Sequence, residues 1–222
     1  MASKNISREK IISAFLFCAF DKNVGSTSLQ DIAEYLGIKK ASLYNHFSGR
    51  DEMYDATLAY CRDYLENLSF IQENFLKLDI FRTKTLCEVL NTLIRRYIQI
   101  YETEPMFQIY AFVHSEQYFN KIAADIADAE YAKLEYGLSR ILLIYCNDKK
   151  AGLSPAELDS AIKWYTSALL QQLDAYIMHK KEIVRQNPEC GAGSLFALPT
   201  DDAALEKIYF LSDYYINSLF KL

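Results

Sequence analysis

Apolar residues recur at helical spacing along almost the whole chain, and this periodicity constrains the fold more than any other feature. Only 7 glycines and 4 prolines interrupt the 222 residues, which is few for a protein built from many strands and turns. Ser7 can cap a first helix, whose apolar face consists of Ile11, Ile12, Phe15, Cys18 and Ala19. Because 51% of the residues are hydrophobic, such helices have ample material for a core, and we expect an all-α protein.

Capping signals divide the first fifty residues into short helices. Asn23 tolerates the left-handed conformation that ends helices, so the first helix is expected to stop there. Ser28 followed by Asp31 predicts a capping box at the start of a second helix, and Gly37 ends that helix. A third short helix is predicted at about residues 39–45.

The residues around Gly37 have the spacing of a helix-turn-helix, in which two short helices flank a turn that contains glycine. In such a motif the later helix enters the major groove of DNA, and the earlier helix braces it across the backbone. Ile38 and Leu43 are expected to point inward. The other face carries donors, acceptors and one flat ring that can reach bases and phosphates, namely Lys39, Lys40, Ser42, Tyr44, Asn45 and His46.

Residues 27–53 resemble the N-terminal signature of TetR-type transcriptional regulators. The resemblance lies in Asp31-Ile32-Ala33, Gly37-Ile38, Leu43-Tyr44-x-His46-Phe47 and Arg50-Asp51, together with Ile11-Ile12-x-Ala14 in the first helix. It departs from the family at Asn23, where glycine is usual. The resemblance implies a three-helix DNA-binding domain at residues 1–50, followed at 51–222 by a ligand-binding and dimerisation domain of about six helices.

The resemblance also implies a set of contacts with double-stranded DNA. Thr27 and Ser28 would bind phosphates near the start of the second helix. Arg50 would bind another phosphate with help from the dipole of the fourth helix. The other implied contacts lie on the third helix, at Lys39, Lys40, Ala41, Tyr44, Asn45 and His46. The alternatives are ordinary solvated side chains, and for His46 a structural cap within the motif.

The net charge of −5 at first argues against a nucleic-acid partner, but the charges are unevenly distributed. Residues 1–50 hold seven Lys and Arg against four acidic residues, a balance of +3, which leaves −8 for the remainder. An acidic body attached to a mildly basic head can still bind DNA, because only the docking face meets phosphates.

Further boundaries predict the helices of the body. Ser48 and Asp51 give a capping-box-like start to a fourth helix at about 49–77. Ser154 before Pro155 is a strong start signal for another helix. After the fourth helix, the remaining predicted helices lie at 83–102, 105–113, 115–146, 155–186 and 201–220.

The last two predicted helices, 155–186 and 201–220, are those that the resemblance implies to pair across a two-fold axis in a homodimer. One apolar stripe consists of Ala161, Ile162, Tyr165, Ala168, Leu169, Gln172, Leu173, Tyr176 and Ile177. The other consists of Leu205, Ile208, Ser212, Tyr215, Ile216 and Leu219. These stripes suit either a dimer interface or an intramolecular core. A dimer whose two heads lie about 34–36 Å apart would read a palindromic operator.

The body is rich in aromatic residues, several of them on helices that surround the ligand pocket in the resembling family. The candidates for ligand contacts are Tyr97, Phe107, Tyr110, His114, Tyr136, Trp164, Tyr165 and Gln171. Rings with a few polar groups suit an amphipathic or flat organic effector. The negative charge of the body favours a cation. The alternative is that these rings are ordinary core residues.

Several other classes of protein lack support in the sequence. It contains no G-x-S-x-G, H-E-x-x-H or P-loop, so we expect neither an enzyme with catalytic residues nor a cofactor. The five cysteines are scattered without a C-x-x-C pair, so no metal site or disulfide framework is expected. Without an apolar run of about 18 residues or a secretion signal, we expect a cytoplasmic protein away from the membrane.

The sequence therefore predicts a ligand-responsive transcriptional regulator. By family habit it would be a repressor that binds its operator as a homodimer and is released by a small effector. The alternative is a DNA-bound regulator, chromosome-organising protein or adaptor that has no small-molecule ligand.

Overall fold

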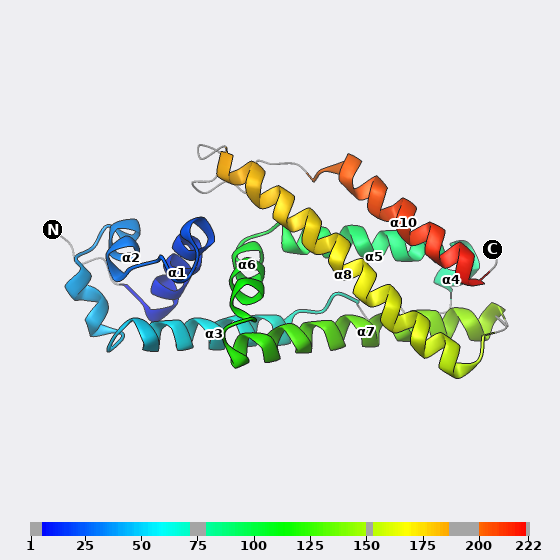
Figure 1. The fold of residues 1–222 in the computed structure, drawn as a ribbon, viewed down its shortest axis with the longest axis horizontal. Coiled ribbons are helices and arrows are strands. Elements are labelled where there is room, and N and C mark those ends of the chain that lie inside the picture. The colour runs from blue at the N-terminus through cyan, green and yellow to red at the C-terminus, as the bar shows by residue number, and fades with distance from the viewer. Residues whose placement is uncertain (1–5, 72–78, 150–152, 187–199, 221–222) are drawn as a thin grey trace. The chain divides into compact units, whose positions relative to one another are not determined.

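A computed structural model describes residues 6–71, 79–149, 153–186 and 200–220. Throughout these ranges the regular elements are helices and no strand occurs, so the prediction of an all-α fold is confirmed (Figure 1). Also within these ranges, no helix combines the length and apolar character needed to cross a bilayer.

The N-terminal part begins with α1 (Arg8–Lys22), α2 (Leu29–Leu36) and the 3-10 helix η1 (Lys40–Asn45), which together form the head. The longer α3 (Arg50–Asn67) follows. It ends well before residue 77, the predicted end of the fourth helix, and residues 72–78 lie outside the described part of the chain.

Local capping explains where α1 and α2 begin and end. The Ser7 hydroxyl accepts a hydrogen bond from the backbone N–H of Lys10 at 3.3 Å, and Asn23 ends α1 with a φ of 81°. Ser28 and Asp31 form the predicted capping box. Gly37 ends α2 with a φ of 65°, a conformation that favours glycine because it has no Cβ. These boundary predictions are confirmed.

The start of α3 differs from its prediction. Gly49 is the N-cap residue and has no side chain to bond. The backbone N–H of Ser48 instead donates to Oε2 of Glu52 at 2.7 Å. The prediction of Ser48 as N-cap with Asp51 as its capping partner was therefore wrong by one residue. The helix begins at Arg50, one residue later than an N-cap at Ser48 would place it.

The third helix of the predicted motif, η1, is a 3-10 helix. Ser42 N–H donates to the carbonyl of Lys39 at 2.8 Å, and His46 N–H donates to that of Leu43 at 2.9 Å, both with the three-residue spacing of this helix type. Leu43 and Phe47 are buried, as expected for the inner face of the motif.

The remaining helices are α4 (Ile80–Thr83), α5 (Leu86–Tyr101), α6 (Met106–Glu116), α7 (Lys121–Lys149), α8 (Pro155–Gln186) and α10 (Asp202–Phe220). The bounds of α8 agree with the predicted 155–186, and Ser154 and Glu157 form its capping box. The prediction that started the next helix at 201 was wrong by one residue.

The chain folds as two compact units, one of residues 1–68 with 104–129 and the other of residues 69–103 with 130–222. In the first unit α6 packs against the head, with Phe112 meeting Phe15 at 5.7 Å between ring centroids and Phe107 meeting Phe20 at 4.8 Å. The helices of the head thus share a core with a segment from the middle of the chain.

In the second unit α8 and α10 lie side by side and antiparallel (Figure 1). Tyr165 bonds Ser212 at 2.7 Å, and the Tyr215 hydroxyl donates to the Ala161 carbonyl at 3.3 Å. Most of the two predicted apolar stripes is buried here, at Ala161, Ile162, Tyr165, Leu169, Leu173, Tyr176, Ile177, Leu205, Ile208, Ser212 and Ile216. Those residues therefore form an intramolecular core.

Candidate nucleic-acid interface

The outer face of η1 is polar and exposed. Tyr44 is 51% exposed, and Lys39, Lys40, Ala41 and Asn45 are also exposed. His46 is half-buried at the end of the helix. Two ammonium groups, a phenol and an amide thus share one short surface whose opposite side is buried in the head.

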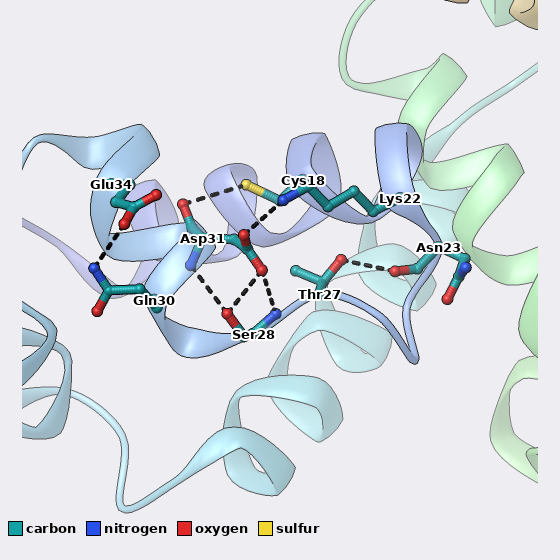
Figure 2. A network of polar contacts seen from close by, with 8 residues as sticks. All are labelled: Cys18, Lys22, Asn23, Thr27, Ser28, Gln30, Asp31 and Glu34. Atoms are coloured by element: carbon teal, nitrogen blue, oxygen red, sulfur yellow. Dashed lines mark hydrogen bonds and ion pairs between the residues drawn. The ribbon is translucent and has the colours of Figure 1, made fainter.

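The start of α2 is held against α1 by a polar network (Figure 2). The Asp31 carboxylate accepts from the Lys22 ammonium group at 2.6 Å and from the Ser28 backbone N–H at 2.8 Å. The Lys22 hydrogen bond, and then the Ser28 bonds, hold the pKa of Asp31 well below its ordinary value. Ser28 itself is exposed at the N-terminal end of α2, where the helix dipole favours an anion.

Two of the residues predicted to bind phosphate instead form hydrogen bonds with backbone carbonyls of the head. Thr27 is buried, and its hydroxyl donates to the carbonyl of Asn23 at 2.7 Å. The Arg50 guanidinium donates from Nε to the carbonyl of Thr27 at 3.0 Å and from Nη2 to that of Val24. It also lies 5.7 Å from the ring centre of Phe15. Both residues hold the segment between α1 and α2.

A second arginine, absent from the predicted site, lies at the other end of the motif. Arg8 donates to the carbonyl of His46 at 2.5 Å and pairs with Glu52 at 2.9 Å. The Ser48 N–H first, and then Arg8, lower the pKa of Glu52 to about 2. No local pattern could have shown this pair, because its members are 44 positions apart in the sequence.

The predicted ligand residues do not gather in one place. Phe107, Tyr110 and His114 belong to α6 in the first unit, where the rings of Tyr110 and His114 stack at 4.0 Å. Tyr136 and Trp164 are exposed, as is Gln171, which is also in the second unit.

Tyr97 and Tyr165 both line a narrow pocket in the second unit. The other lining residues are Phe70, Ile71, Leu90, Leu93, Ile94, Leu134, Leu138 and Leu169. Beside it, the buried Glu130 accepts hydrogen bonds from the hydroxyls of Tyr97, at 2.8 Å, and Tyr101. The pocket is therefore apolar with a carboxylate behind one wall, a feature that sequence reasoning missed.

No group of three or more His, Cys, Asp or Glu side chains in the described ranges is arranged to hold a metal ion. A short helix with an exposed polar face, which follows α2 after a tight turn and packs on a buried core, is typical of a helix-turn-helix DNA-binding protein.

Comparison with known proteins specifies the class further. Residues 11–57 match the model of the family described as bacterial regulatory proteins, tetR family. This match covers most of α1, all of α2 and η1, and the start of α3, so the N-terminal part of the chain is similar to the DNA-binding domain of TetR-type transcriptional regulators.

The chain is also similar to curated regulators. It is 26% identical over 175 residues to the biofilm operon icaADBC HTH-type negative transcriptional regulator IcaR of Staphylococcus aureus, covering 74% of this chain and 86% of that one. It is 33% identical over 67 residues to IcaR of Staphylococcus epidermidis, covering 30% of this chain and 35% of that one.

Two solved structures share the fold. AibR in complex with isovaleryl coenzyme A and operator DNA is 16% identical, with a TM-score of 0.55 over 92% of this chain and 96% of that one. A TetR transcription regulator from Haloarcula marismortui is 14% identical, with a TM-score of 0.55 over 95% of this chain and 96% of that one.

Proposed function

We propose that this protein is a repressor that binds a palindromic operator as a homodimer and is released by a small amphipathic effector. The observation that carries the proposal is the exposed polar face of η1, whose opposite side is buried in the head. The similarity to IcaR, whose name describes a negative regulator, supports repression rather than activation.

The DNA contacts that we propose are the exposed residues of the predicted set. Lys39 and Lys40 bind phosphates, and Tyr44 contacts phosphate or a thymine methyl group. Asn45 reads a base edge, since amides pair with adenine. Ser28, Ala41 and His46 complete the set. Thr27 and Arg50 act on DNA indirectly, because their polar atoms are used within the head.

The proposed dimer interface is formed by the sides of α8 and α10 that face away from their own core. On α8 the exposed residues Trp164, Ala168, Gln171, Ala175 and Met178 alternate at spacings of four and three, the repeat of packed helices. The two alanines allow a close helix approach. On α10, Phe210 and Tyr214 are 70% and 69% exposed, with Leu211 beside them.

These exposed rows, with large apolar side chains at Trp164, Met178, Phe210 and Tyr214, are well suited to a second copy of the same chain. A two-fold axis places the same surface on both partners, so one apolar face is sufficient. The acidic remainder of the chain limits association elsewhere by self-repulsion.

The effector site that we propose is the pocket lined by Tyr97 and Tyr165. AibR, which has a similar fold, is named in complex with isovaleryl coenzyme A, an acyl thioester, and this supports testing acyl compounds as effectors. An effector must bind the DNA-free conformation more tightly than the DNA-bound one, or it shifts nothing. We propose that it acts on the heads through α3 and through α6, which shares their core.

One observation favours the alternative of a regulator without an effector. The pocket has room for about one water molecule, so a ligand must first widen it. Thermal unfolding with a library of acyl compounds and aromatic cations separates the two functions. A compound that raises Tm and lowers operator affinity supports an effector, and a library without any such compound supports the alternative.

The proposed function is tested by selecting bound fragments from a random DNA pool. Enrichment of a palindrome, bound by two chains, is the expected result. A folded protein that enriches no sequence contradicts the proposal. Lys39→Ala with Lys40→Ala should abolish enrichment, whereas Arg62→Ala, an exposed residue further along α3, should leave it intact.

A further inference from the structure

We propose that Arg8 and Glu52 form a clamp that sets the position of the reading helix, so that Arg8 determines operator specificity without touching DNA. The proposal rests on the assignment of η1 to operator reading. The pair consists of two positioning residues, neither of which belongs to the predicted set of DNA contacts.

The clamp acts where the reading helix ends. The Arg8 guanidinium donates to the carbonyl oxygen of His46, the residue after η1, at 2.5 Å. The same guanidinium lies 4.1 Å from the ring centre of Phe47, which is buried. One side chain thus holds two consecutive residues, through a hydrogen bond to the first and a cation–π contact to the second.

Glu52 completes the clamp from the other side. Its Oε1 pairs with Arg8 at 2.9 Å, and its Oε2 accepts from the Ser48 N–H at 2.7 Å. Residues 46–48 are therefore connected to the first residue of α1 and to the first turn of α3. Both are longer helices than η1 and have buried faces that pack in the core of the first unit.

The reading helix needs such external support because it is short. A six-residue 3-10 helix has few internal hydrogen bonds and poor bond geometry, so it does not fix its own position. Recognition requires side chains held within about 0.5 Å of their productive geometry. Tyr44 and Asn45, directly before the clamped segment, are the side chains that loss of the clamp displaces most.

Arginine is the residue type that this position requires. Its planar fork donates to a carbonyl and a carboxylate at once while its face lies on a ring, which a lysine ammonium group cannot reproduce. Arg8→Lys therefore keeps the charge and removes the clamp. This variant separates a positioning role from a charge that attracts DNA.

The test measures the affinity of the full chain for the selected operator and for a random duplex, each over a range of salt concentrations. Arg8→Lys, Arg8→Ala and Glu52→Gln are compared with Arg62→Ala as control. We expect each clamp variant to weaken operator binding about tenfold, the scale of one charged hydrogen bond. Binding to the random duplex and the salt slope should change little for Arg8→Lys and Glu52→Gln.

Other outcomes overturn the proposal. If Arg8 contacts a phosphate, Arg8→Ala lowers the salt slope by about 1 and weakens both duplexes alike, and Arg8→Lys restores binding. If the pair only stabilises the fold, the ratio of operator to random affinity stays at the wild-type value once the folded fraction is measured by circular dichroism. A wild-type chain with no operator preference contradicts the proposed function itself, and is recognised before any variant is compared.

Discussion

Arg50 Nε lies 3.0 Å from the carbonyl oxygen of Thr27, so the first residue of α3 holds the loop that precedes α2. The same guanidinium donates to the Val24 carbonyl. Together with Arg8 at the end of η1, it means that the segment before α2 and the segment after η1 are each held by an arginine from the start of a longer helix.

Replacing Arg50 should therefore destabilise the protein. Arg50→Ala removes the side-chain donor from the Thr27 carbonyl and leaves the Val24 carbonyl with only the Thr27 N–H, and we expect the free energy of unfolding to fall by about 1–2 kcal/mol. Urea unfolding followed by circular dichroism measures this, with Arg62→Ala as the matched control. Equal stability of the two variants would show that the Arg50 hydrogen bonds contribute nothing in solution.

Acid should weaken the head through Glu52. Its folded pKa is about 2, below the ordinary value of 4.5, because it accepts from the Ser48 N–H and from Arg8. A lowered pKa stabilises the fold fully above the unfolded value, so this contribution is lost as the pH falls from about 4.5 toward 2. We expect the urea midpoint of the wild type to fall more steeply over that range than that of Glu52→Gln. Parallel curves for the two proteins would contradict the assignment.

The second unit contains a buried ion pair whose removal should be costly. Lys180 is 4% exposed and lies 2.8 Å from Glu102, which also accepts from the hydroxyls of Tyr176 and Thr200. Lys180→Met leaves the carboxylate buried without this cation, and we expect a loss of about 3 kcal/mol in unfolding free energy. Chemical denaturation measures it, with Lys207→Met on the exposed side of α10 as control. A loss no larger than that of the control would contradict a stabilising pair.

A charge on the exposed rows of α8 and α10 should separate the dimer. Ala175→Arg or Phe210→Arg places a guanidinium against its own symmetry mate, where burial without a counter-charge is unfavourable. Sedimentation equilibrium should report monomers for both variants. Leu143→Arg, on an exposed position of α7, should remain dimeric. Dimers in all three variants would place the interface elsewhere.

Local signals in the sequence predicted most of the secondary structure. Ser7, Ser28 and Gly37 act on neighbours within a few residues, so their roles follow from spacing alone. Contacts such as Arg8 with Glu52, and Glu102 with Lys180, join positions that only the tertiary fold brings together. No periodicity contains that information.

The long helix α8 shows a second limit of pattern reading. It has an apolar stripe through Leu169 and Leu173, which is core, and an exposed row through Trp164 and Met178. Periodicity detects both faces but does not show which one meets the chain's own core. For the same reason Trp164, a predicted ligand contact, is 64% exposed in the structure, on the row that we propose for the dimer.

Hydroxyl-radical footprinting on the selected operator tests the central claim most directly. A dimer with two reading helices should protect two regions about one helical turn apart, on the same face of the duplex. Tyr44→Ala should weaken both protections together. A single protected region, or protection that is unchanged when Tyr44, Lys39 and Lys40 are all replaced, would contradict a dimer that reads DNA through η1.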